Sequence, residues 1–200
     1  MYFPSIDDER TTLRNYLKVQ LEAVRDAGYG LSDEQLVAQP TASKLSLAGL
    51  LKHCLWVMTQ ALVGAGVMTP EESPVATQHP ATDFYASFAL TDSETVSSIK
   101  EAYEALMQRY LEMISSLDMD AEITSAPQPW YGINEPHTVA MRYLVAHHLE
   151  EFARHAGHAD IIREQIDGAQ AAELNAAVEG REANEYVTPW TPHNPSIIME

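Results

Sequence analysis

The chain has 200 residues, which is enough for one domain with a sizeable core, and 46% of them are hydrophobic. Acidic residues outnumber basic ones by 29 to 12, and the resulting net charge of -17 repels nucleic-acid phosphates and anionic membrane surfaces. The composition therefore predicts a protein that binds neither nucleic acid nor a membrane.

The N-terminal residues MYFPSIDDER contain neither the basic nor the apolar segment of a signal peptide, so we expect a cytoplasmic protein. The first helix should begin after Ser5 and end near Asp26, before the glycines of AGYG. A short helical turn, LSDEQL, follows with a capping-box pattern. The second long helix is expected from about Ser46 to Val63; polar residues interrupt its apolar side, which favours a core helix over a membrane span.

Residues 68–90 hold three prolines among small polar residues, and we expect a long crossover loop without regular structure there. The third helix should begin at Thr91 or Asp92, with Glu94 completing the cap, and end near Ser116. A second loop, 117–136, carries aromatic residues that could roof a pocket or plug the end of a bundle.

The fourth helix is expected over residues 138–166 and should stop at Gly168, which can adopt the left-handed cap. Residues 170–179 favour one more short helix, and the proline-containing remainder favours an extended tail. No stretch alternates apolar and polar residues long enough to propose a sheet. The sequence thus predicts an all-α protein: a four-helix bundle with long crossover loops over residues 1–168 and a short helix and irregular tail over 169–200.

Ionisable side chains occupy one stripe of the fourth helix. At about 100° per residue, eight residues lie within about 60° of Glu151; they are Ala140, Leu144, His147, His148, Arg154, His155, His158 and Ile162. Arg142 and Asp160 lie on the opposite side, which suits solvent, so we expect the Glu151 stripe to face the bundle. Burying such groups costs several kcal/mol unless they are paired or bind a cation, so the stripe favours a metal.

Glu151 and His155 are four residues apart, a spacing across which two side chains can bind one ion, and His147 and Glu151 share it. All three can hardly bind together, because eight residues span about 12 Å of helix axis. The best partner elsewhere is His53, at mid-helix in LAGLLKHCLW with the small Gly49 beside it. A lone helical histidine is more often hydrogen-bonded core, but the joint pattern favours metal binding.

Several other residues of these types have simpler interpretations. Cys54, the only cysteine, is turned about 100° from His53 and is expected to pack in the core. Aromatic residues such as Trp56 and Trp130 are more often core or lid than substrate platforms. His79, His137 and His193 lie in predicted loops or the tail, so we expect them to be solvated.

The segment HHLEEFARHAGHADIIREQIDG, from His147 to Gly168, resembles the fourth-helix signature of the DinB-like superfamily, in particular the mycothiol-dependent maleylpyruvate isomerase-like proteins. LSLAGLLKHCLWV resembles the second helix of that family, and LTDSETVSSIKEAY the start of its third. The resemblance covers about residues 8–168. It implies a four-helix bundle with a metal held by a histidine of the second helix and a His-x-x-x-His or Glu-x-x-x-His pair of the last.

Carried over by motif, the implied ligands are His53, Glu151 and His155, with His147 as the alternative. Arg154 and His158 are candidates for contacts around the metal or with the substrate. Zinc is the first choice of ion, and nickel, iron or manganese remain open because ligand types alone do not select one.

Three protein ligands leave an open coordination position, which in similar enzymes takes the thiol of mycothiol or bacillithiol. The resemblance implies a metal-dependent thiol S-transferase or thiol-assisted isomerase, in which a metal-bound thiolate attacks a small electrophile. Two alternatives stay open: a non-catalytic, metal-stabilised small-molecule-binding or stress protein, and a non-haem iron site. Whether two bundles pair as a homodimer is also left open.

Overall fold

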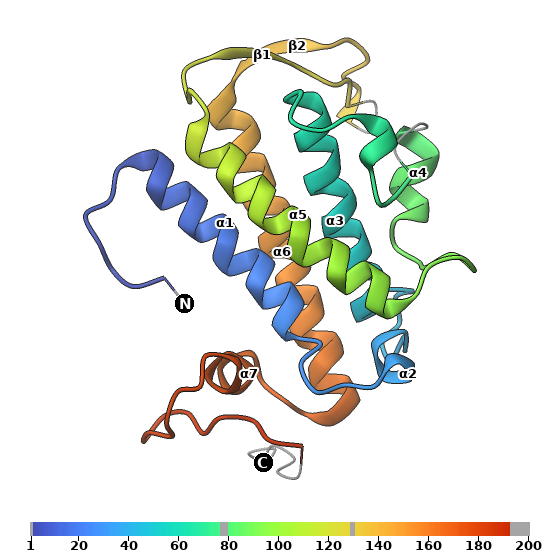
Figure 1. Ribbon diagram of the computed structural model, residues 1–200, viewed down its shortest axis with the longest axis vertical. Coiled ribbons are helices and arrows are strands. Elements are labelled where there is room, and N and C mark those ends of the chain that lie inside the picture. The colour runs from blue at the N-terminus through green and yellow to red at the C-terminus, as the bar shows by residue number, and fades with distance from the viewer. Residues whose placement is uncertain (1, 77–79, 129–130, 193–200) are drawn as a thin grey trace.

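The computed structural model describes residues 2–76, 80–128 and 131–192. Four long helices dominate it: α1 (Glu9–Asp26), α3 (Leu47–Gly64), α5 (Val96–Ser116) and α6 (Met141–Asp167). Helix α1 packs against α5 and α6, and α3 packs against the same two, so the four helices enclose one core (Figure 1). The predicted all-α four-helix bundle is confirmed.

Local sequence signals set the ends of these helices. Asp8, Ser46 and Thr95 cap α1, α3 and α5, each accepting the backbone N–H three residues further on. Gly168 ends α6 with a φ of 79°, as its sequence position predicts. Helix α5 begins at Val96 rather than at 91 or 92, because the Glu94 carboxylate closes a separate turn by accepting the Thr91 N–H at 2.7 Å.

The expectation of no regular structure over residues 68–90 is wrong. A short 3-10 helix, Pro70–Glu72, and helix α4, Pro80–Ala86, lie within that range. Pro80 is the first residue of α4, where a missing N–H costs nothing and a fixed φ favours the helix. Proline there begins a helix instead of preventing one, and α4 lies beside α3 (Figure 1).

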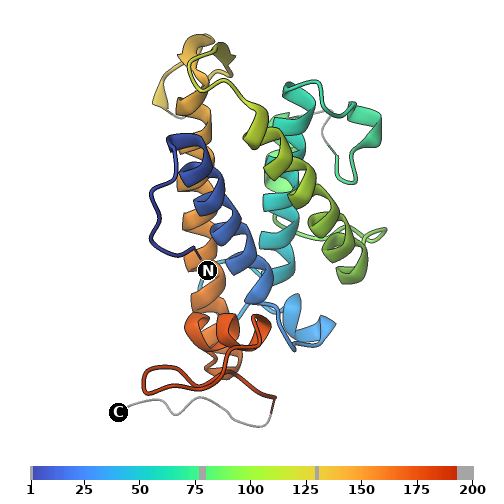
Figure 2. The same ribbon diagram turned by 60° about the vertical axis from the view of Figure 1, so that its left-hand side comes forward.

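The expectation of no sheet is also wrong. Strands β1 (Glu122–Ser125) and β2 (His137–Ala140) pair antiparallel with Glu122 opposite Ala140. Each strand has four residues, too few for alternation to stand out in the sequence. Helix α6 consequently begins at Met141, not at 138. The strands lie at one end of the bundle and α7 (Ala171–Val178) at the other (Figure 2).

The segment after α6 is packed against the bundle as far as Trp190. The Trp190 ring lies 4.7 Å from the guanidinium carbon of Arg163, and its backbone N–H donates to the Glu173 carbonyl at 3.0 Å. Gly30, with a φ of 73°, lies under the ring; a Cβ there would be 2.5 Å from it.

Arg163 is fully buried and donates to Asp167 and to the carbonyls of Ala27 and Tyr29. The short helix predicted near 170–179 is present as α7, and the short helical turn predicted at LSDEQL is present as α2 (Asp33–Leu36), with the expected capping box of Ser32 and Gln35.

Helix α3 is the one helix in the described part of the chain that is long and apolar enough to cross a membrane, by length and composition only. However, 67% of that stretch is buried inside the bundle. This is the burial expected of a core helix.

Candidate metal centre

His53 of α3 and Glu151 and His155 of α6 come together in the bundle. Glu151 Oε1 lies 2.9 Å from His53 Nε2 and 3.2 Å from His155 Nε2. One ligand atom from each residue lies within 4.8 Å of the others, which makes these three a candidate metal site. His53 and His155 are buried, and Glu151 is half-buried.

Helix α4 and the turn after it cover His53. The Phe88 ring stacks on the imidazole with centroids 3.9 Å apart, and Ser87 Oγ lies 2.8 Å from His53 Nδ1. Gly49 makes this approach possible, because a Cβ there would lie 2.2 Å from the Phe88 carbonyl oxygen. The room that Gly49 leaves beside His53 is therefore filled by the backbone of Phe88.

The second histidine is held in a similar way. His155 Nδ1 lies 3.4 Å from His158 Nδ1, and the two rings are 5.5 Å apart. Both candidate ligand histidines thus have Nδ1 facing another side chain and Nε2 facing Glu151. A metal-binding histidine usually has its second nitrogen in such a hydrogen bond, which orients the ring.

The electrostatics of the cluster follow from these contacts. The side-chain contacts with His155 and then His53 hold the pKa of Glu151 well below its usual range, so its carboxylate is ionised at neutral pH. Burial lowers the pKa of His53, which favours the neutral imidazole that metals bind. Burial also lowers the pKa of His158.

The arrangement fits a divalent cation. Ligand atoms about 2.1 Å from a tetrahedral ion lie about 3.4 Å apart, slightly more than the 2.9 and 3.2 Å that separate Glu151 Oε1 from the two imidazole nitrogens. If His53 Nδ1 carries the proton that Ser87 accepts, its neutral ring directs a lone pair at a carboxylate oxygen 2.9 Å away. Two acceptors facing each other need a proton or a cation between them.

The buried side of α6 is rotated from the predicted stripe. Its buried residues include Val145, Phe152, Ala156 and Ala159, so the stripe predicted around Glu151 lies at the edge of the buried face. The structure therefore places His147 and Arg154 outside the cluster, with side chains 47% and 62% exposed and each paired with Glu150.

His148 of the stripe and Cys54 are buried in the core, away from the three candidate ligands. His148 is buried with Nδ1 2.9 Å from the Tyr110 hydroxyl, and burial followed by the nearby His147 lowers its pKa to about 4. Cys54 is fully buried, as predicted, and burial raises the pKa of its thiol. His137 is exposed on β2, as predicted. The expectations for His79, Trp130 and His193 fall outside the described residues.

Sequence reasoning missed the contribution of α4. Ser87 and Phe88 were part of a segment interpreted as loop, although Phe84 and Phe88 stand four residues apart, the spacing of a helical face. Trp56 completes this cover, with its ring 5.8 Å from that of Phe84. Among the described residues, neither Trp56 Nε1 nor the Nε2 of Gln60, one turn further along α3, has a hydrogen-bond acceptor although both atoms are buried.

The comparisons with known proteins bear on the whole bundle. The sequence model of the family described as Mycothiol-S-transferase matches residues 12–168, from early α1 to the glycine that caps α6. No curated protein matches the chain. The matched range includes His53, Ser87, Glu151 and His155, and the family lies in the DinB-like superfamily that the helix motifs resemble. The chain therefore belongs to the mycothiol-S-transferase family.

Proposed function

We propose that this protein is a metal-dependent thiol S-transferase in which His53, Glu151 and His155 hold one divalent ion, with zinc as the first choice. Membership of the mycothiol-S-transferase family supports a thiol-related transferase that acts on a small molecule. The observation that carries the metal dependence is the convergence of two imidazole nitrogens on one carboxylate oxygen, at 2.9 and 3.2 Å, between two helices.

The proposed reaction joins the sulfur of a low-molecular-weight thiol, such as mycothiol, to an electrophilic carbon. A bound divalent cation supplies the positive charge that favours thiolate over thiol at neutral pH. With an aryl chloride, the S–H and C–Cl bonds break, an S–C bond forms, and a proton and chloride leave. Atoms and electrons balance without any oxidant or reductant.

The protein's own residues orient and shield this chemistry. His53 and His155 present Nε2 because Ser87 and His158 face their Nδ1 atoms. Phe84, Phe88 and Trp56 pack around His53 and keep bulk water from that side. The buried N–H groups of Trp56 and Gln60 could donate to carbonyl or hydroxyl oxygens of a ligand that displaces the side chains now covering them.

The test combines metal analysis with an S-transfer assay using mycothiol and 1-chloro-2,4-dinitrobenzene. Wild-type protein is expected to retain about one ion per chain. Alanine in place of His53, Glu151 or His155 should remove the ion and lower the transfer rate by roughly 100-fold or more. The matched control is His147→Ala, an exposed histidine on the same helix, which should change neither quantity.

Two results would count against the proposal in different ways. Stoichiometric metal in both His53→Ala and Glu151→Ala would remove the proposed ligand set. Metal-loaded wild-type protein that consumes no thiol with any of a broad panel of electrophiles would reject the S-transfer reaction and leave the metal site standing.

A further inference from the structure

We propose that Ser87 is a positioning residue that holds the proton of His53 on Nδ1, so that Nε2 presents its lone pair to a metal. The metal-binding consequence rests on the function proposed above, but the position of the proton does not. Ser87 lies directly after α4 and is 2% exposed, so water does not compete for its hydroxyl.

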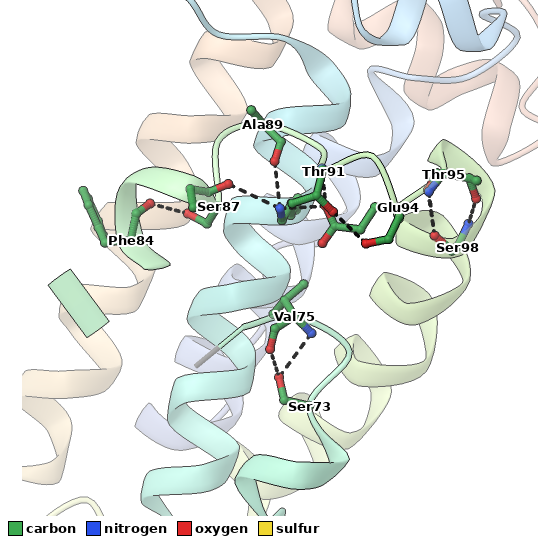
Figure 3. Close-up of polar contacts among 12 residues, drawn as sticks. Ser73, Val75, Phe84, Ser87, Ala89, Thr91, Glu94, Thr95 and Ser98 are labelled. Carbon is green, nitrogen blue, oxygen red and sulfur yellow. Dashed lines mark hydrogen bonds and ion pairs between the residues drawn. The ribbon is translucent and has the colours of Figure 1, made fainter. Parts of the chain in front are cut away.

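The hydroxyl of Ser87 has one hydrogen and two close neighbours. Its Oγ lies 2.5 Å from the Phe84 carbonyl oxygen and 2.8 Å from His53 Nδ1 (Figure 3 shows the Phe84 contact). A carbonyl oxygen can only accept, so the single hydroxyl hydrogen must point to Phe84. The Ser87 oxygen then accepts a hydrogen bond, and His53 Nδ1 must carry the proton that is donated.

The backbone around Ser87 is fixed from both sides. The Ser87 N–H donates to the Asp83 carbonyl at 2.8 Å, which continues the last turn of α4. The buried ammonium of Lys52 donates to the carbonyls of Ala86 and Ala89 and to the Glu94 carboxylate. Lys52 thus anchors the turn that carries Ser87 to the same helix that carries His53.

Glu151 works against the form that binds metal. In the metal-free protein its carboxylate, 2.9 Å from His53 Nε2, is best satisfied by a proton on that nitrogen. A neutral imidazole has one N–H, so the contacts of Ser87 and Glu151 favour opposite tautomers. Ser87 offsets the pull of Glu151, and its loss should shift the proton to Nε2, which a metal must then displace.

The first measurement is the tautomer of His53 by long-range ¹H–¹⁵N NMR at pH 8, in metal-free and zinc-bound protein. We expect Nδ1 to carry a proton in both states of the wild type, and metal-free Ser87→Ala to carry its proton on Nε2 alone. The second measurement is zinc affinity by competition with a chelating dye. Ser87→Ala should bind zinc about 10- to 100-fold more weakly, and Ser87→Thr, which keeps the hydroxyl, should retain most of the affinity.

The matched control is Ser73→Ala, in the same segment between α3 and α5. In Figure 3 the Ser73 hydroxyl is drawn in contact with the backbone of Val75 and not with His53. Ser73→Ala should therefore change neither the tautomer of His53 nor the zinc affinity.

The outcomes separate this inference from the proposed function. An Nδ1 without a proton in metal-free wild-type protein overturns the role of Ser87, and this result is available even if Ser87→Ala does not fold. Unchanged zinc affinity in a folded Ser87→Ala variant also overturns it. If the wild type binds no metal but keeps the Nδ1–H form, the proposed metal function fails while the contact with Ser87 stands.

Discussion

Asp160 lies on α6 opposite the Glu151 stripe, where the helical wheel predicts solvent. The structure places it half-buried at the wall of a cavity of about 260 Å³ between α1, α6 and α7, near Glu22 and Asp26. Burial, and then the charge of Glu164, raises the pKa of Asp160 to about 6. The expectation of a solvent-facing carboxylate is therefore wrong, because α7 packs close to this side of the helix.

This pKa has a measurable consequence for stability. Because the folded-state pKa lies above the unfolded value of 3.8, the unfolded chain releases its proton first as pH rises, and stability is lost between about pH 4 and 6. Asp160→Asn should therefore raise the free energy of unfolding at pH 7 by about 1 kcal/mol, a value reduced for solvent screening. The gain should shrink toward zero near pH 4.

Urea denaturation at both pH values checks this expectation. Glu112→Gln, at an exposed position of α5, is the control and should change stability at neither pH. An equal gain for Asp160→Asn at pH 4 and pH 7 would mean that the substitution acts through packing or helix propensity and not through the titration.

At the scale of elements, α7 packs on α1, and the segment that follows it is joined to the bundle through Trp190. Its ring packs on Gly30, Tyr29 and Arg163 and forms a small apolar cluster with Ala169 and Leu174. Trp190→Ala should cost roughly 3 kcal/mol of unfolding free energy. Gly30→Ala should also destabilise, because the added Cβ meets the ring and the backbone φ is positive.

Guanidinium denaturation of the two variants measures both costs. Tyr186→Ala removes an exposed aromatic side chain from the same segment and should have almost no effect. Wild-type stability in Trp190→Ala would show that the segment beyond α7 contributes little to the fold.

The elements that could be predicted are those whose signals are local. The long helices repeat their apolar residues often enough to be recognised, and the glycine stop at Gly168 is explicit. Two helix starts were expected too early, after Ser5 and at Thr91 or Asp92, whereas Asp8 and Thr95 are the caps. The grouping of His53 with Glu151 and His155 was predictable because helical spacing pairs Glu151 with His155 or His147 and the mid-helix His53 is the best partner elsewhere. The family motif then favoured the set without His147. Short elements such as α4, β1 and β2 carry too few residues for a period to emerge.

The contacts that could not be predicted are those between distant segments. Ser87 meets His53 across 34 residues of sequence, and Arg163 meets Ala27 across 136. Neither contact leaves a periodic signal, since each depends on how a loop or helix end docks on the bundle. The exposure of His147 and Arg154 depends similarly on a rotation of α6 that packing of Phe152 and its neighbours determines.

At the scale of the whole molecule, the net charge of -17 affects which electrophiles reach the site. A field of this sign repels anionic substrates over distances up to the screening length, which falls from about 30 Å at 0.01 M salt to about 8 Å at 0.15 M. The value of kcat/KM for an aryl chloride bearing a carboxylate should therefore rise severalfold over this range. A neutral aryl chloride of equal reactivity should show almost no change, because its approach is not steered by charge.

Steady-state rates at saturating mycothiol measure kcat/KM for both substrates. A fall with added salt for the carboxylate substrate would instead indicate a cationic patch near the centre, and the exposed Arg154, on the helix that carries Glu151, would then be the first residue to substitute.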